Sequence, residues 1–183
     1  MKKPNFHIFA DGSCDAGKHD MGAWAAYVIG PESRKLLYGM LQPTTISRCE
    51  LLPLIEGLRY IRKLLKGRIS GIGVRVISDS EYTIKTLSGL YPVNKNRDLW
   101  SAMDYVQRGF VVDWVYRERN SHYYMELCDS VCSVLRKRSI EVIKDMLGGE
   151  PAHIADNVPI VDLPVTDDDQ LLKGLTDANI THS

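Results

Sequence analysis

The chain has 183 residues, of which 44% are hydrophobic and 25% charged, and its 23 basic and 23 acidic residues give a formal net charge of zero. This length and composition predict one well-packed domain with a short appendage. No apolar run approaches the roughly 18 residues of a membrane-spanning helix, and the first residues lack a signal-peptide apolar region, so we expect a cytoplasmic protein without membrane contact.

Hydrophobic periodicity and turn residues predict nine elements in chain order. These are strands at 6–10, 22–30 and 35–41, a helix at 46–66, a strand at 73–78, helices at 80–89 and 97–108, a strand at 110–117 and a helix at 122–143. Turn signals between the first three strands favour an antiparallel meander, and the later alternation favours parallel additions to the same sheet. The order βββαβααβα therefore predicts a mixed five-stranded α/β sheet with helices on both faces.

The zero net charge conceals two unlike segments. Residues 145–183 hold eight acids and one base, so the totals of 23 and 23 leave 22 bases and 15 acids, a net charge of +7, in residues 1–144. A basic body suits a polyanionic partner, although scattered basic residues also occur on any solvated surface. Gly148, Gly149 and Pro151 are typical of a linker. We expect a folded domain over 1–144 and an acidic, flexible tail over 145–183, which either modulates the body or only aids solubility.

Four acidic residues stand at predicted element boundaries. Asp11 follows the first apolar strand and Asp79 the fourth, while Glu50 lies near the start of the long helix and Asp129 in the first turns of the last one. Carboxylates at the ends of neighbouring strands and at helix starts can converge on one point. Hard divalent cations take oxygen ligands, and two of them about 4 Å apart can clamp the attacking and leaving oxygens of a phosphodiester.

Each acid taken alone also has a structural explanation. Asp11 with Gly12 is a common turn pair, and Asp79 can cap the following helix. Ser47 and Glu50 fit the S-x-x-E capping box, and Asp129 fits an exposed helical position. Turn and cap chemistry does not require all four acids in one ordered pattern, however, which favours a shared site. The four cysteines have no C-x-x-C spacing, so we expect reduced, packed thiols and no zinc site.

Four segments that contain these acids resemble the conserved blocks of one enzyme family. ADGSC (10–14), TTISRCELL (44–52), SDSEY (78–82) and HYYMELCDSV (122–131) resemble, in order and spacing, the blocks of type 1 ribonucleases H, over roughly residues 5–143. The resemblance implies an RNase H-like fold and endonucleolytic cleavage of the RNA strand of RNA/DNA hybrids. It also implies two Mg²⁺ ions, with Mn²⁺ as a substitute, no small-molecule cofactor, and products with a 5′-phosphate and a 3′-hydroxyl.

The resemblance assigns roles to the acids as metal ligands and catalytic residues. Asp11 is expected to bridge both metals, Glu50 and Asp79 to complete the site for the leaving 3′ oxygen, and Asp129 to hold the metal that activates water. His122 resembles the histidine ahead of the family's last helix, which could move protons or assist product departure. Its alternative is an exposed residue of the first helical turn.

The expected substrate contacts depart from the family pattern in places. The residues expected to contact the substrate are Gly12, Ser13, Cys14, Ser47, Arg48, Glu81, Lys95, Arg97 and Trp100. Ser47 follows an isoleucine where the family often has two asparagines, and Glu81 replaces a frequent glutamine. The extra basic helix of some members is expected to be absent. Lys95, Arg97 and Trp100 would then supply a reduced phosphate contact. In the alternative, the two bases form a solvated helix start and Trp100 packs in the core.

Two alternatives to this function stay open. A non-catalytic binding module of the same fold would normally have lost at least one carboxylate, whereas all four are present. Another nuclease of the same superfold would space its acids differently and lack the block around Arg48-Cys49-Glu50.

Overall fold

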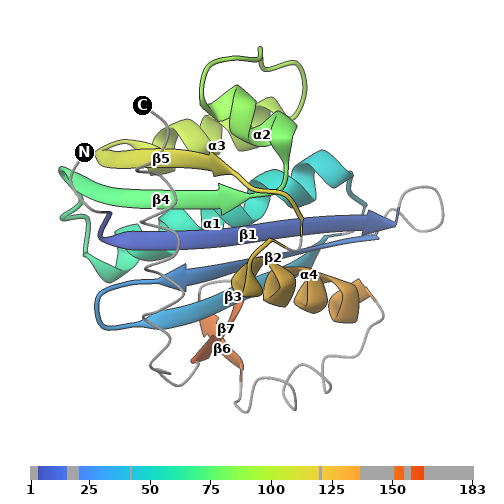
Figure 1. Cartoon of the computed structure of the whole chain (residues 1–183), viewed down its shortest axis with the longest axis horizontal. Helices are drawn as coiled ribbons and strands as arrows, with labels where there is room; N and C mark the ends of the chain where they lie inside the picture. Colours follow the sequence, from blue (N-terminus) through green and yellow to red (C-terminus); the bar gives the residue numbers. More distant parts are fainter. Residues whose placement is uncertain are drawn as a thin grey trace.

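The computed structural model describes residues 4–15, 21–41, 43–119, 121–136, 151–154 and 158–162. In chain order the elements are β1 (Phe6–Asp15), β2 (Met21–Ile29), β3 (Arg34–Leu41), α1 (Ile46–Leu64), β4 (Ile72–Ser78), α2 (Glu81–Leu87), α3 (Arg97–Gln107), β5 (Phe110–Tyr116), α4 (Tyr123–Arg136), β6 (Pro151–Ile154) and β7 (Val158–Asp162). The strands lie side by side in the order β5-β4-β1-β2-β3-β7-β6 (Figure 1).

The mixed sheet agrees with the prediction for the five strands β1 to β5. β1, β2 and β3 form an antiparallel meander. β4 pairs with β1, and β5 with β4, in parallel. A parallel pair needs a crossover, and α1 supplies the one between the meander and β4. The α/β class, the strand types and the four helices are therefore as the apolar pattern predicts.

Helices cover both faces of the sheet because alternate strand residues point to opposite sides. Ile8 and Ala10 of β1 join a core cluster that includes Leu54 of α1 and Met103 of α3. Phe9 instead packs in a second cluster with α4. Figure 1 shows α1 and α4 on opposite sides of β1, so β1 is sandwiched at the centre of the molecule.

The first strand is longer than expected. The sequence predicts that β1 ends at residue 10, yet its pairing with β2 continues from His7↔Ile29 to Asp15↔Met21. Polar residues after Ala10 conceal this extension, and β2, buried along its whole length, provides the partner that allows it. The expectation that Asp11 stands at the end of its strand is therefore wrong, because β1 continues beyond Asp11 in its pairing with β2.

Two strands lie in the segment that the sequence assigns to the tail. β7 pairs antiparallel with β3 through Leu36↔Val161, and β6 pairs with β7. Neither strand was predicted, because each is short and contains a proline, which is tolerated at strand starts and sheet edges. The flexible character predicted for 145–183 otherwise falls outside the described residues. Among the helices of the described part of the chain, none is long and apolar enough to span a bilayer.

Candidate active site

Asp11 and Asp79 are neighbours at the point where β1 and β4 part. The parallel pairing of the two strands ends at Ala10↔Ser78, and each acid is the next residue along its strand. Asp11 is only 6% exposed, and its Oδ2 is buried without a hydrogen-bond partner. A buried, unpartnered carboxylate oxygen is costly, which makes this position suited to a cation.

The electrostatics of this pair reflect burial and crowding. Burial, then the charges of Asp79 and Asp129, raise the pKa of Asp11 to about 7, while Arg119 and the Gly12 backbone N–H act in the opposite direction. Burial also raises the pKa of Asp79, and Arg119 again opposes the shift. Like charges that cannot all be hydrated retain protons, so the site favours bound positive charge.

Glu50 reaches the same region from α1. Its Oε2 accepts a hydrogen bond of 2.8 Å from the Ser80 hydroxyl. Burial raises the pKa of Glu50, Ser80 lowers it, and the Asp79 charge raises it further. A Cβ at Gly12 would lie 2.3 Å from the Cys49 backbone, so only glycine lets β1 approach α1 this closely.

The capping-box interpretation of Glu50 is wrong. The N-cap of α1 is Thr45, and Ser47 lies inside the first helical turn, where it cannot serve as the cap. The cap predicted beside Asp79 does exist, but Ser80 provides it: its side chain accepts from the Thr83 N–H. Glu50 is therefore free of helix capping and directed toward Ser80.

Asp129 is brought to the site by the way α4 docks on β1. The Cys128 thiol donates to the Phe9 carbonyl at 3.4 Å, and the Cys132 thiol donates to the Asp11 carbonyl at 3.6 Å. Both thiols are buried, and Asp129 lies between them in the helix. Its carboxylate forms an ion pair with Arg119, in the segment that joins β5 to α4.

The donor set fits a hard divalent cation. Asp11, Glu50, Asp79 and Asp129 offer carboxylate oxygens, which Mg²⁺ and Mn²⁺ prefer. Within the described residues, however, no three acidic, histidine or cysteine side chains are arranged so that they could together hold a metal ion. Two of the four acids are instead held by internal partners, Glu50 by Ser80 and Asp129 by Arg119.

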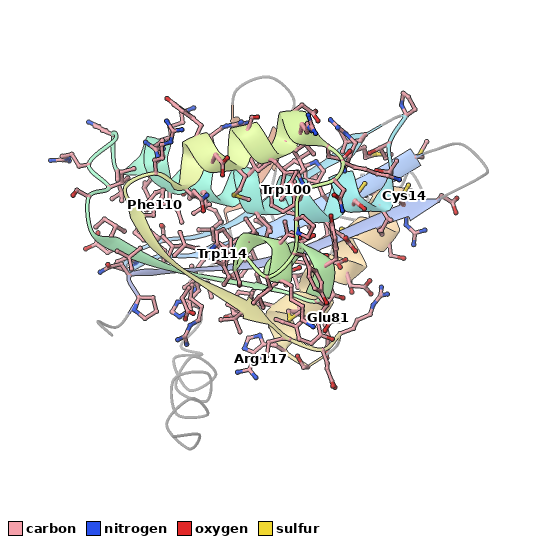
Figure 2. All side chains as sticks on the ribbon, turned by 90° about the horizontal axis from the view of Figure 1, so that it is seen from above. Cys14, Glu81, Trp100, Phe110, Trp114 and Arg117 are labelled. Atoms are coloured by element: carbon pink, nitrogen blue, oxygen red, sulfur yellow. The ribbon has the colours of Figure 1, made fainter. Side chains whose placement is uncertain are left out.

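The predicted contacts on β1 lie just beyond Asp11. Gly12, Ser13 and Cys14 are half-buried and pair with β2. The Ser13 hydroxyl is buried without a hydrogen-bond partner, and the Cys14 thiol donates to the Thr44 carbonyl at 3.8 Å. Figure 2 places Cys14 toward the far end of β1. All four cysteines are free thiols.

A pocket of about 310 Å³ brings other predicted contacts together. It is lined by Ser47, Tyr82, Thr83, Asn94, Lys95, Asn96 and Trp100. Three of these were predicted. Trp100 is only 9% exposed and also belongs to the core, so its packing and its place at the pocket coexist (Figure 2). The two amide side chains in the VNKN stretch, Asn94 and Asn96, could have been predicted from the sequence as polar contacts. Tyr82 and Thr83 could not, because only the position of α2 in the fold brings them to the pocket.

Three further predicted contacts, Arg97, Glu81 and Arg48, lie outside this lining. Arg97 is exposed at the start of α3. Glu81 is exposed and pairs with Lys85 at 2.6 Å. Only Arg108 and Gly109 separate α3 from β5, so the described stretch between Asp79 and the start of α4 holds no additional helix after α3.

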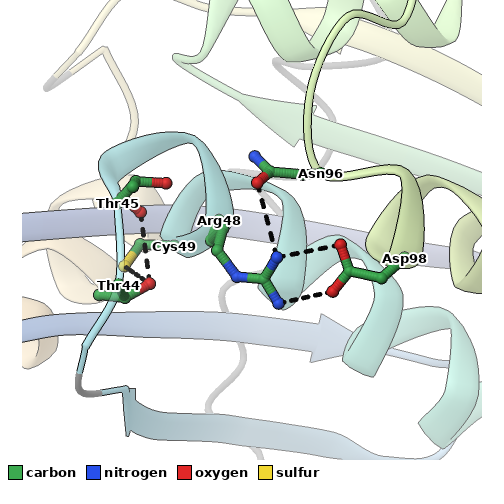
Figure 3. A network of polar contacts seen from close by, with 6 residues as sticks. All are labelled: Thr44, Thr45, Arg48, Cys49, Asn96 and Asp98. Atoms are coloured by element: carbon green, nitrogen blue, oxygen red, sulfur yellow. Dashed lines mark hydrogen bonds and ion pairs between the residues drawn. The ribbon is translucent and has the colours of Figure 1, made fainter.

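Arg48 has partners within the protein. Its guanidinium donates to both carboxylate oxygens of Asp98, at 3.0 and 2.7 Å, and to the Asn96 side chain at 3.5 Å (Figure 3). This bidentate pair ties the start of α1 to the start of α3. The two helix starts border the pocket, so Arg48 holds its walls at a fixed separation.

His122 lies immediately before α4 and packs against the sheet. Its ring stacks on Phe9 with a centroid distance of 4.6 Å, and its Nδ1 accepts from the Tyr124 N–H at 3.2 Å. Burial and the charge of Arg117 lower its pKa, while Glu126 raises it. Its Nε2 is buried without a partner. The alternative of a fully exposed first-turn residue is therefore wrong.

Comparison with protein families identifies relatives over most of the chain. A family model described as RNase H matches residues 3–134. The chain is 31% identical to a ribonuclease H from Herminiimonas arsenicoxydans over 151 residues, which are 74% of this chain and 94% of that protein. It is 30% identical to one from Cupriavidus metallidurans over 141 residues, 69% of this chain and 91% of the other.

Solved structures agree with these relatives in fold. LC9-RNase H1, described as a type 1 RNase H with the type 2 active-site motif, aligns with a TM-score of 0.60 and 19% identity over 75% of this chain and 74% of that one. LC11-RNase H1, solved in complex with an RNA/DNA hybrid, aligns with a TM-score of 0.57 and 15% identity over 72% of this chain and 99% of that one.

Proposed function

This chain belongs to the ribonuclease H family, and we propose that it is a divalent-metal-dependent endoribonuclease that cleaves the RNA strand of RNA/DNA hybrids. The two-metal mechanism and the products, a 5′-phosphate and a 3′-hydroxyl, are part of this proposal. The observation that carries it is the adjacent pair Asp11 and Asp79, with a buried, unpartnered oxygen on Asp11. Glu50 and Asp129, which approach from α1 and α4, are the other two proposed ligands.

The chemistry follows from the charge of this site. Two Mg²⁺ or Mn²⁺ ions, when bound, would lower the pKa of a water and neutralise the leaving oxygen. The protein holds their ligands rigidly: Asp11 is fixed in the central strand and Glu50 at a helix start. Burial and repulsion already raise the pKa of Asp11, Asp79 and Glu50, so cations relieve a cost that the fold imposes.

Hybrid binding is proposed to use the pocket beside α1 and the backbone that follows Asp11. Ser47 and Tyr82 line the pocket within three residues of Glu50 and Asp79 respectively. Asn94 and Asn96 provide amide donors, and Lys95 a positive charge for a phosphate. Gly12 to Cys14 would contact the RNA strand, where the 2′-hydroxyl distinguishes RNA from DNA. The LC11 complex supports a hybrid as the ligand of this fold.

His122 is proposed to assist proton movement. Its lowered pKa keeps the ring neutral near pH 7, and a neutral imidazole can accept a proton. Its Nε2 is buried and has no hydrogen-bond partner within the described residues. The stack on Phe9 fixes the plane of the ring.

A cleavage assay tests the proposal. Labelled hybrid is compared with single-stranded RNA, duplex RNA and duplex DNA, in Mg²⁺, Mn²⁺ and EDTA. We expect metal-dependent cleavage of the hybrid alone, with 5′-phosphate ends. Asp79→Asn should lower turnover by orders of magnitude at unchanged hybrid affinity, because it removes ligand charge and preserves shape. Asp104→Asn, an exposed acid on α3, is the matched control.

The same assay separates the alternatives. Hybrid binding without cleavage in either metal would favour a binding module, and equal cleavage of duplex DNA would favour another nuclease of the fold. Full Mg²⁺-dependent activity in Asp79→Asn would remove this residue from the metal site.

A further inference from the structure

Arg119 stands among the acids of the proposed metal site. The segment that bears it leaves β5 and is tethered to the end of β4, because the Arg117 N–H donates to the Ser78 carbonyl at 3.0 Å. Ser78 directly precedes Asp79, so the chain runs along the acidic edge before it enters α4. Two residues after this tether, the Arg119 guanidinium pairs with Asp129.

The charge of Arg119 acts on more than its direct partner. It lowers the pKa of Asp11 and of Asp79, opposing the burial that raises both. In turn, Asp129, Asp11 and Asp79 raise the pKa of Arg119, and Asp129 has the largest effect. One guanidinium thus compensates three of the four carboxylates.

We propose that Arg119 is an internal counter-ion that competes with divalent cations for Asp129 and thereby sets the metal affinity of the site. This inference rests on the proposed function, in which these acids are metal ligands. In the metal-free protein Arg119 limits repulsion among Asp11, Asp79 and Asp129. A cation that uses Oδ1 of Asp129 must displace the guanidinium, because Arg119 binds that oxygen.

The geometry makes this displacement easy. The Arg119 side chain is 63% exposed and that of Asp129 32% exposed. An exposed ion pair contributes little, because water solvates both partners once they separate. The long arginine side chain can therefore turn into solvent while the backbone stays tethered at Ser78. Glu50, held by the neutral Ser80 hydroxyl, presents no competing charge.

Calorimetric titration of Mg²⁺ and Mn²⁺ into the substrate-free protein tests the proposal. Arg119→Gln should bind the cations up to about fivefold more tightly, which is the range that an exposed ion pair allows. Arg119→Lys, which keeps the charge, should lie near wild type. Arg117→Gln is the matched control, since it removes the same charge from the same segment and should leave the affinity unchanged.

A double-mutant cycle isolates the competition. In an Asp129→Asn background, Arg119→Gln should change cation affinity less than it does in the wild-type background, because the carboxylate for which arginine and metal compete is gone. Thermal melts in EDTA should show Arg119→Gln as less stable than wild type at neutral pH and more strongly stabilised by Mg²⁺.

Three outcomes would overturn the proposal, and each points to a different error. Equal affinity in wild type and Arg119→Gln would make the pair a passive surface contact. Weaker binding in the variant would make Arg119 a support that holds Asp129 in place for the metal. Absence of cation binding by either protein would remove the metal site and the proposed function with it.

Discussion

Replacing Asp11 with asparagine should stabilise the metal-free protein while it abolishes cleavage. Asp11 is 6% exposed, its Oδ2 has no partner, and its pKa is raised from 3.8 to about 7. Asparagine has nearly the same shape and no charge. The substitution therefore removes an ion that the fold buries at a cost, and it also relieves the repulsion that Asp79 experiences.

The magnitude follows from linkage between protonation and folding. A shift of about three pKa units corresponds to roughly 4 kcal/mol, taken as an upper limit because the buried carboxylate can relax or recruit water. Below about pH 4, Asp11 is protonated in both states and its burial costs little. Between about pH 4 and the folded-state value of about 7, the unfolded chain releases the proton that the folded protein keeps, so the free energy of unfolding falls as the pH rises.

Urea unfolding in EDTA at several pH values measures this effect. Wild type should lose up to about 4 kcal/mol relative to Asp11→Asn between about pH 4 and pH 7.5, and Mg²⁺ should restore stability to wild type alone. Asp104→Asn, at an exposed position, should show no such pH-dependent difference. A stability difference between Asp11→Asn and wild type that stays constant with pH would refute the reasoning, because the carboxylate would then pay no burial cost.

Three further results are expected from the substrate side and the tail. Lys95→Ala with Arg97→Ala should raise the Michaelis constant and reduce the slope of log affinity against log salt by about one or two, as expected for lost phosphate contacts. An unchanged slope in a salt titration would assign both bases to the solvated surface. His122→Ala should lower kcat by about tenfold to a hundredfold at an unchanged Michaelis constant. It should also remove the loss of rate that protonation of this ring causes in acid. An unaltered pH–rate profile would show that the ring only packs on Phe9. Neutralising 167–169 with asparagine should tighten hybrid binding at low salt, with the gain fading as salt is added, if the acidic tail competes with the hybrid; equal affinities at low salt would make the tail passive.

Local chemistry was enough to predict the strands β1 to β5, the four helices and the ordered set of acids. Apolar residues at helical or alternating spacing must face a core, so Leu54, Ile8 and Phe9 identify their elements without knowledge of the fold. The acids were recognisable because Asp11 and Asp79 directly follow apolar runs, and Glu50 and Asp129 lie in the first turns of predicted helices.

Contacts between distant residues decided the remainder. Polar residues hide the end of β1, which extends to Asp15 only because β2 pairs with it, and β7 forms only because β3 offers an open edge. The sequence offers Ser47 as a cap for the helix that contains Glu50, whereas the observed N-cap is Thr45, and the Glu50 carboxylate accepts from Ser80, thirty residues away.

The partners of the charged side chains depended most strongly on tertiary structure. Arg48 meets Asp98 at a separation of 50 residues. Arg119 meets Asp129 because α4 packs on the sheet in the second core cluster, where the Cys128 and Cys132 thiols donate to carbonyls of β1. Hydrophobic periodicity is set by neighbours along the chain, whereas an ion pair requires two side chains to meet in space. The sequence alone therefore supplied the proposed metal ligands, and the fold decided that Asp129, among them, pairs with an arginine.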